Sequence, residues 1–348
     1  MNTGFLTAEE RARRLCPPAG KLRLVIDSDA KNEVDDQFAI AWALRSPERF
    51  DVEAIYAVPF SHGVYRHNLG QLDFPDIEPP AEGMEASYQE IQKLCDLLGE
   101  RPSGGVFRGA EGYMPGPGQP VASEAVSDLI ARGMEGEGLL YVAAIGAATN
   151  IASALLLEPR LRERLVVIWL GGQPLYFPYG IEFNLAQDIF ASQHLFSCGV
   201  PLVWVPCLTV ASQLVLTDSD VREKLLGRSR LGSYLAEIVL AQFPGLEKAV
   251  SRAAYHRTLL LRGRDDMEED YLSQFPSRHA AWSRPIWDTA AIAFLKNPGW
   301  TQSTRIPSPV LRDDCRWETA PGRHLIRAVN YCQRDLIMGD MLACLNGV

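Results

Sequence analysis

The residues best suited to chemistry form an acidic run near the N-terminus. Five carboxylates fall within ten residues, namely Asp27, Asp29, Glu33, Asp35 and Asp36. Carboxylates at this density repel one another unless protons, cationic partners or a metal ion neutralise them. Hard divalent cations such as Ca²⁺ and Mg²⁺ prefer oxygen ligands of this kind. The run therefore predicts either a metal site or a solvated acidic loop whose last residues cap a helix.

The elements around this run indicate how it is held. An apolar stretch, Leu22–Ile26, leads directly into it, and similar stretches recur at Val52–Phe60, Leu139–Ile145, Leu165–Leu170 and Pro201–Val205. Short, uniformly apolar runs are typical of strands buried on both faces. Helical patterns alternate with them at Asp36–Arg45, Ser87–Leu98, Ser123–Arg132, Asn150–Leu157 and Ile189–Ser197. The alternation predicts an α/β fold with a mainly parallel central sheet flanked by helices, and ligands at the carboxyl ends of the strands.

The rest of the chain is expected to belong to the same domain. Residues 1–21 are expected to form an N-terminal helical extension, and residues 22–348 one domain without internal repeats or a linker. The segment Ser219–Asn297 has a helical pattern. The segment Thr301–Arg323 is expected to be irregular, and His324–Leu345 to be a C-terminal helix.

Two segments are expected to be loops. Gly104–Gln119 is rich in glycine and proline, and His67–Gly83 has three prolines and little periodicity. The second loop could be a lid over a site or a plain surface connection, and the residues do not decide between these.

Composition narrows the possible partners. The 348 residues carry a net charge of −9 and are 47% hydrophobic, which favours a globular protein and argues against a nucleic-acid polymer as ligand. No apolar stretch is long enough for a transmembrane helix, and no signal peptide is expected. The seven cysteines are scattered without CxxC spacing, which favours the reducing cytoplasm.

Two kinds of phosphate chemistry can be compared with this sequence. A hydrophobic strand ending in Asp-x-Asp also begins the haloacid-dehalogenase phosphatases, in which the first Asp is a nucleophile. Those enzymes usually place Thr or Val four residues after that Asp, where this chain has Lys31. A Mg²⁺-dependent phosphatase thus stays an alternative, whereas a P-loop enzyme is excluded because no GxxxxGK[ST] motif is present.

Four motifs in order resemble the inosine–uridine-preferring nucleoside hydrolase family, over roughly residues 22–345. Asp27-Ser28-Asp29 followed by Asp35-Asp36 resembles the family's DxDxxxDD signature, in a longer Asn-Glu-x-Asp-Asp form. Ile145–Ala152 resembles the family's TGPLTNIA turn. Gly171-Gly172 with Glu182-Phe183-Asn184 and Asp188 resembles GG…EFNxxxDP, and Trp287–Ala290 resembles HDPxA.

The resemblance implies a Ca²⁺ site and a nucleophilic water. The carboxylates of Asp29, Asp36 and Asp288 correspond to the family's calcium ligands, and the backbone carbonyl of Ile145 to the remaining protein ligand. Asp29 would also take a proton from the attacking water. The implied reaction is Ca²⁺-dependent hydrolysis of the N-glycosidic bond of a ribonucleoside, which releases base and ribose.

Other positions would hold the substrate or its surroundings. Asp35, Glu182 and Asn184 correspond to residues that bind ribose hydroxyls, and Asp27 is expected to support the loop. Relatives are commonly dimers or tetramers, so a homodimer or homotetramer is expected. The small-molecule partner is then a nucleoside, with a modified or non-standard base among the candidates.

The residues around the leaving base depart from the family. Trp287 stands where relatives often have a histidine, and indole is no acid at neutral pH. Trp287 could be a stacking platform for the base or a core residue. His256 is a candidate leaving-group acid, whereas His62 is expected to be structural. Tyr176, in the loop after Gly172, either clamps a base or packs its loop.

These departures keep a second class of function open. A protein that retained the metal cage but lost leaving-group activation would bind ribose or a nucleoside as a sensor, without turnover. Arg66, His67 and Arg257 could bind a phosphate or an unusual base, although solvent exposure is the simpler expectation.

Overall fold

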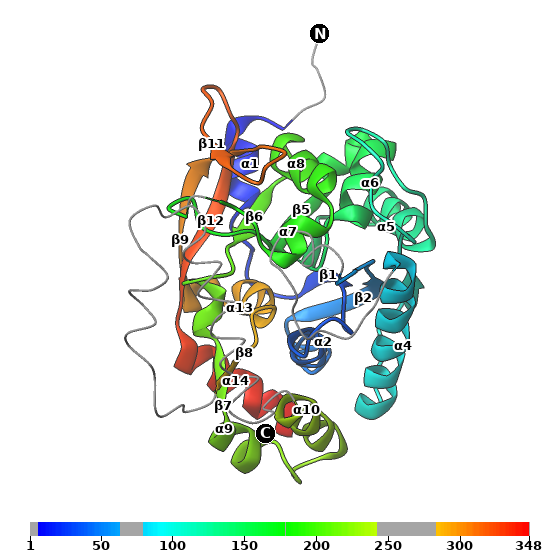
Figure 1. Cartoon of the computed structure of the whole chain (residues 1–348), viewed down its shortest axis with the longest axis vertical. Coiled ribbons are helices and arrows are strands. Elements are labelled where there is room, and N and C mark those ends of the chain that lie inside the picture. The colour runs from blue at the N-terminus through cyan, green and yellow to red at the C-terminus, as the bar shows by residue number, and fades with distance from the viewer. Residues whose placement is uncertain (1–5, 63–78, 178, 242–282, 348) are drawn as a thin grey trace, which may run out of the picture.

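The computed structural model describes residues 6–62, 79–177, 179–241 and 283–347 (Figure 1). An eight-stranded sheet in the order β3-β2-β1-β4-β5-β6-β12-β9 forms the centre. Neighbouring strands are parallel except β9, which is antiparallel to β12. The strands are β1 (Leu22–Ser28), β2 (Phe50–Ala57), β3 (Val106–Arg108), β4 (Leu140–Ile145), β5 (Leu165–Leu170), β6 (Leu202–Val205), β9 (Thr301–Pro307) and β12 (Leu325–Cys332).

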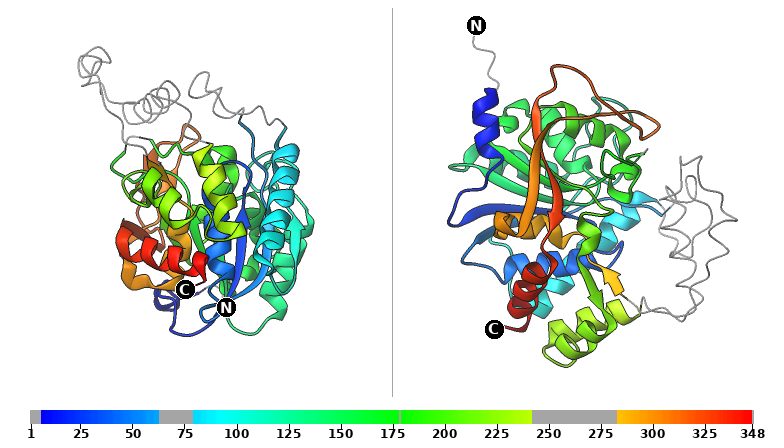
Figure 2. Two further views of the ribbon diagram at one scale, coloured as in Figure 1. Left: turned by 90° about the horizontal axis from the view of Figure 1, so that it is seen from below. Right: turned by 90° about the vertical axis from the view of Figure 1, so that its left-hand side faces the viewer.

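Helices cover both faces of this sheet, and the chain folds as a single α/β domain (Figures 1 and 2). On one face lie α2 (Asp35–Leu44), α4 (Pro80–Leu98), α10 (Arg230–Leu240), α13 (Thr289–Lys296) and α14 (Arg334–Asn346). On the other lie α5 (Glu124–Glu135), α6 (Thr149–Leu157) and α8 (Ile189–Ser197). Because both faces are covered, β4 and β5 are buried at every position, as their uniformly apolar sequences predict.

Shorter elements complete the description. They are α1 (Ala8–Arg14), α7 (Phe183–Gln187), α9 (Asp218–Lys224), the pair β7 (Val215–Thr217) and β8 (Ser283–Pro285), the pair β10 (Val310–Leu311) and β11 (Trp317–Glu318), and 3₁₀ turns at Pro159–Glu163, Ala211–Gln213 and Pro298–Trp300. The α1 region contacts the sheet through Arg327, which donates to the Leu15 carbonyl at 2.8 Å. No described helix is both long enough and apolar enough to cross a bilayer.

The predicted fold class and the five predicted strands are confirmed, but the C-terminal expectations are wrong. Thr301–Arg323 is not irregular, because it contains β9, β10 and β11. The expected helix His324–Leu345 is a strand, β12, followed by α14. The edge strand β9 is largely polar and half-exposed, and β12 is only partly buried, so neither has the continuous apolar run used to find strands.

Two loop expectations also need correction. The short strand β3 lies within the expected loop Gly104–Gln119. Helix α4 begins at Pro80, so the last residues of the expected loop His67–Gly83 are helical. Proline is favourable in a first helical turn, because the N–H groups there have no acceptor within the helix and none is lost. Residues 63–78 of that loop lie outside the described residues, as do residues 242–282 of the expected helical segment.

A buried asparagine ties together three strand ends that lead toward the acidic run. Asn150 donates from Nδ2 to Asp27 Oδ1 at 2.9 Å and to the Ala57 carbonyl at 3.3 Å. Its Oδ1 accepts from the Ala110 amide at 2.9 Å. The ends of β1, β2 and β3 are thereby fixed relative to one another, and Asp27 is engaged in this support.

Gly109 leaves room for this asparagine, so we predict that Gly109→Ala destabilises the fold. A Cβ at this position would lie 1.9 Å from the Ala57 carbonyl oxygen and 2.6 Å from Asn150 Nδ2. Overpacking of this kind costs about 1–3 kcal/mol of unfolding free energy, measurable by urea denaturation. Gly112→Ala is the control, because a Cβ there meets nothing within 4 Å. Equal stability of the two variants would contradict the prediction.

Candidate functional site

The predicted site lies at the carboxyl edge of the sheet, where β1 and β4 end side by side. In the register of these strands Ser28 lies opposite Ile145. The next residue, Gly146, approaches Asp29 so closely that a Cβ on it would lie 3.3 Å from the Asp29 carboxyl carbon. The backbone at the end of β4 is therefore an immediate neighbour of Asp29.

Two helices point their N-termini at the same place. Helix α2 starts with Asp35 and Asp36, and Asp288 is the N-cap of α13, which packs against α2. A helix N-terminus carries partial positive charge and unpaired N–H groups, so it stabilises nearby carboxylates. The fold thereby brings Asp36 and Asp288 together, although they are 252 positions apart in the sequence.

The carboxylates form a compact buried group. One oxygen from each of Asp35, Asp36 and Asp288 lies within 4.8 Å of the others. The Asp288 amide donates to Asp35 Oδ2 at 3.2 Å, and the Ser28 hydroxyl donates to Asp36 Oδ1 at 2.5 Å. Asp29 is equally buried, and its Oδ2 accepts no hydrogen bond from any described residue. These four carboxylates accept too few hydrogen bonds to offset the cost of burying four negative charges.

Burial and mutual repulsion raise the pKa of every member. Burial together with the charge of Asp35 raises the pKa of Asp36 to about 8. Burial together with Glu33 raises the pKa of Asp35 to about 6. Burial and the neighbouring carboxylates also raise the pKa values of Asp29 and Asp288 well above the ordinary range. Without a cation, the group therefore retains protons near neutral pH.

The donor set fits a hard divalent cation. It offers only carboxylate oxygens and the adjoining strand-end backbone, and it includes the orphaned Asp29 Oδ2. The tightest set contains Asp35, which the sequence analysis assigned to a ribose hydroxyl, whereas Asp29 lies beside it. The structure thus places the predicted carboxylates in one buried group, in which Asp35 rather than Asp29 is the closest neighbour of Asp36 and Asp288.

Glu182 and Asn184 lie at the end of β5 and are held by backbone groups. Glu182 caps α7, accepting from the amides of Gly172 at 2.7 Å and of Asn184 and Leu185 at 3.1 Å. Asn184 donates from Nδ2 to the Leu170 carbonyl at 3.0 Å. Burial raises the pKa of Glu182 to about 7. The proposed ribose contacts would therefore come from side chains that already order the loop.

The sequence did not identify Tyr113, which lies near Asp29, or its hydrogen-bond partner Gln187. The Tyr113 hydroxyl donates to Gln187 Oε1, and Gln187 exchanges two hydrogen bonds with the Ser61 backbone, at 3.0 and 2.9 Å. Burial, together with the nearby carboxylates of Asp29 and Asp188, raises the pKa of the Tyr113 hydroxyl. Tyr113 falls in a glycine- and proline-rich stretch without periodicity, so no local pattern identified it.

Trp287 immediately precedes Asp288 and is buried. The guanidinium carbon of Arg284 lies 5.0 Å from the centroid of its ring, and Arg284 forms an ion pair with Glu33. A tryptophan, a cation and the acidic run therefore adjoin one another on the side of the site that the sequence assigned to the base.

Other candidates lie around this centre or outside the described residues. His62 is buried, with Nε2 at 3.3 Å from Asn32 Oδ1 and its ring packed against Phe60. Tyr176 is 72% exposed and hydrogen-bonded to the Thr209 hydroxyl. Four residues lie outside the described part of the chain, namely Arg66, His67, His256 and Arg257.

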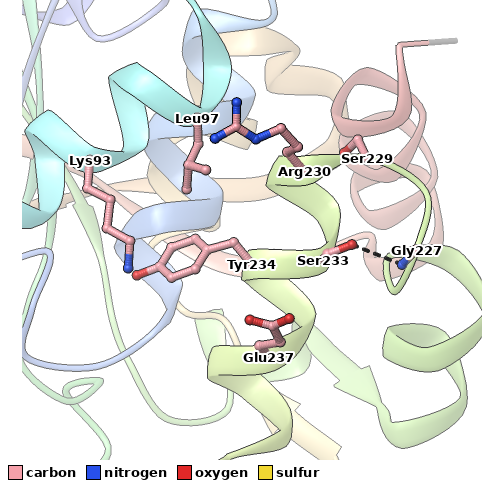
Figure 3. A pocket seen from close by; sticks show the side chains of 8 residues that line it. All are labelled: Lys93, Leu97, Gly227, Ser229, Arg230, Ser233, Tyr234 and Glu237. Carbon is pink, nitrogen blue, oxygen red and sulfur yellow. Dashed lines mark hydrogen bonds between the residues drawn. The ribbon is translucent and has the colours of Figure 1, made fainter.

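A separate hollow of about 520 Å³ lies between α4 and α10 (Figure 3). Lys93 on α4 points at Tyr234 on α10, with its amine 3.9 Å from the ring centroid. None of the residues lining this hollow was predicted for the site, and it contains none of the four carboxylates. It is a groove at a helix–helix contact.

Comparison with known proteins agrees with this geometry. The sequence relatives include a probable uridine nucleosidase 2 of Arabidopsis thaliana, 27% identical over 62% of this chain and 68% of that protein. They also include the non-specific ribonucleoside hydrolase RihC of Salmonella schwarzengrund, 32% identical over 57% of this chain and 65% of that protein. The matched segments thus cover about two thirds of these relatives.

The fold has matching solved structures. A plant nucleoside hydrolase, PpNRh1, superimposes with a TM-score of 0.64 at 17% identity, covering 94% of this chain and 99% of that one. The model of the family described as inosine-uridine preferring nucleoside hydrolase matches residues 24–310. That range contains the acidic run, the strand-end motifs and Asp288, and the chain belongs to the inosine-uridine preferring nucleoside hydrolase family.

Proposed function

We propose that this protein hydrolyses the N-glycosidic bond of a ribonucleoside in a Ca²⁺-dependent reaction, releasing a base and ribose. The observation that carries the proposal is the buried group of four carboxylates at the carboxyl edge of the sheet. Membership in the family supports it, as does similarity to a probable uridine nucleosidase and a non-specific ribonucleoside hydrolase. A modified or non-standard base is included in the proposal.

Calcium would be held by the carboxylates of Asp29, Asp36 and Asp288 and by the backbone carbonyl of Ile145. Calcium accepts six to eight oxygen ligands in flexible geometry, which leaves places for water and sugar hydroxyls. The bound cation supplies one thing to the chemistry, a lower pKa for the attacking water. Asp35 is close enough to the same oxygens to serve as a further ligand or to hold a ribose hydroxyl.

Each of the other side chains has a separate role in the proposed reaction. Asp29 takes the proton of the attacking water, for which its Oδ2, without a partner among the described residues, is suited. Asp35, Glu182 and Asn184 hold ribose hydroxyls and so place C1′ beside the water. Trp287 offers an aromatic face to the base. Positive charge that develops on the sugar in the transition state is stabilised by this acidic surrounding.

The proposal extends to the assembly and the location of the protein. A homodimer or homotetramer in the cytoplasm is expected, and the scattered cysteines without CxxC spacing are typical of a reducing compartment.

A product assay tests the proposed activity. The purified chain is incubated with Ca²⁺ and a panel of purine, pyrimidine and modified ribonucleosides, with and without a chelator, and free base is measured by chromatography. We expect base release that the chelator abolishes and added Ca²⁺ restores. Tight nucleoside binding in a thermal-shift screen without any base release would contradict hydrolysis and favour the sensor.

Substitution of the carboxylates separates the proposed roles. We predict that Asp29→Asn and Asp36→Asn each lower kcat by at least about 100-fold, because each removes a charged ligand and the first also removes the proton acceptor. Asp27→Asn is the matched control: it should reduce kcat less, since Asp27 is bonded to Asn150. Equal tolerance of Asp29→Asn and Asp27→Asn would refute the assignment, and a larger loss in Asp27→Asn would favour the phosphatase alternative.

The raised pKa values predict how calcium stabilisation depends on pH. The pKa values of Asp35 and Asp36, about 6 and 8, exceed the ordinary 3.8, so the metal-free native state binds protons more tightly than the unfolded state. This contribution to stability is complete below about pH 4 and is lost as the pH rises through 6 and 8. Because Ca²⁺ replaces those protons, the Ca²⁺-induced rise in Tm should be larger at pH 8.5 than at pH 5.5. Calorimetry that found the opposite order would contradict a calcium site here.

A further inference from the structure

Arg284 is a buried cation that adjoins the site without a complete set of partners. It lies in β8, three residues before Trp287, and is only 4% exposed. One Nη donates to the Glu33 carboxylate. Its Nε–H, however, has no acceptor among the described residues. Buried N–H groups rarely lack a hydrogen-bond acceptor, because removing them from water without forming a hydrogen bond is unfavourable.

The guanidinium adjoins two residues proposed to contact the substrate. Its central carbon is 5.0 Å from the centroid of the Trp287 ring, the aromatic surface proposed for the base. It is also close enough to Asp35 for its charge to lower the pKa of that carboxyl. Arg284 thus lies between the proposed base platform and a carboxylate proposed to hold the ribose.

Cleavage of the glycosidic bond leaves negative charge on the base, and Trp287 cannot donate a proton to it. When the bond between C1′ and the base nitrogen breaks, its electron pair stays on the base, which leaves as an anion unless it is protonated. Indole donates no proton at neutral pH. A guanidinium also keeps its proton, but it can donate a hydrogen bond and neutralise negative charge. Preorganised donors of this kind stabilise anions strongly in a site shielded from water.

We propose that Arg284 contacts the leaving base, donating its Nε–H to it and stabilising the negative charge that develops as the glycosidic bond breaks. This inference rests on the proposed function. In the step, water oxygen bonds to C1′, the electron pair of the broken bond passes to the base nitrogen, and Asp29 takes the water proton. The base anion then gains a proton from solvent and Asp29 releases its own to solvent, while Arg284 remains protonated throughout.

The test compares leaving groups that differ in their need for stabilisation. Uridine and inosine release poor leaving groups, whereas p-nitrophenyl β-D-ribofuranoside releases a stable phenolate with the same sugar. We expect Arg284→Gln to lower kcat on the two nucleosides by about 100-fold, the usual effect of removing one oxyanion donor. The same variant should lower kcat on the nitrophenyl riboside by less than about 3-fold.

Two further variants control for folding and for charge in general. Arg284→Lys keeps a cation opposite Glu33 but lacks the planar guanidinium, so it should fold and still be impaired on nucleosides selectively. Arg108→Gln is the matched control, because Arg108 also pairs with a carboxylate, Glu85 at 2.7 Å, and lies 3.8 Å from an aromatic ring centroid, that of Tyr88. The Arg108 side chain is 42% exposed and bonds Glu85, not any of the four carboxylates of the site, so neither substrate should be affected.

Each outcome decides the question. Selective loss on nucleosides in both Arg284 variants supports the inference. Equal losses on nucleosides and on the nitrophenyl riboside would overturn it and leave Arg284 as a structural partner of Glu33 and Trp287. Unchanged nucleoside hydrolysis would overturn it as well. A wild-type chain that hydrolyses the nitrophenyl riboside and no nucleoside would overturn it while sparing the glycosidase, whereas inactivity on every substrate would overturn the proposed function itself.

Discussion

The constraint on which the site depends is the burial of four carboxylates at one edge of a parallel sheet. Asp29, Asp35, Asp36 and Asp288 are nearly inaccessible to water, and they have only a few hydrogen-bond donors. The N-termini of α2 and α13 offset part of the repulsion, but not four charges. Without a cation, the raised pKa values keep protons on part of the group near neutral pH, and a divalent cation would replace those protons. The same unfavourable charge density would thus give the site its affinity for a metal.

The rest of the fold keeps this arrangement rigid. Asn150 joins the ends of three strands, Glu182 gathers three backbone amides at the end of β5, and Asp188 links α8 to the Met114 amide. Each is a buried polar side chain that bonds backbone groups, so its main effect is to fix the position of the backbone around the site. Near Asp288 the arrangement differs in kind, because Trp287 and Arg284 place an aromatic ring and a cation beside one another. In the proposed function, chemistry on the sugar and stabilisation of the base would therefore be carried by separate elements.

The sequence predicted the centre of the fold well and its margins poorly, for physical reasons. Strands such as Leu165–Leu170 are buried on both faces, so their composition alone identifies them. The antiparallel edge strand β9 is polar, and its position depends on pairing with β12, which no local pattern specifies. The carboxylates of the acidic run could be recognised from their density. Tyr113, Gln187 and Arg284 could not, because their contacts form only when distant segments pack together: Tyr113 near Asp29, Gln187 against Ser61 and Arg284 against Glu33.

The proposed function requires the carboxylate group to be a calcium site that faces a ribose. This can be tested with a crystal structure of the protein grown with Ca²⁺ and ribose, in which the ion is identified by anomalous scattering. We expect one ion bound by Asp29, Asp36, Asp288 and the Ile145 carbonyl at about 2.3–2.6 Å, with sugar hydroxyls completing its coordination. Density without an ion at these carboxylates, or an ion bound elsewhere while the ribose lies far from Asp29, would contradict it.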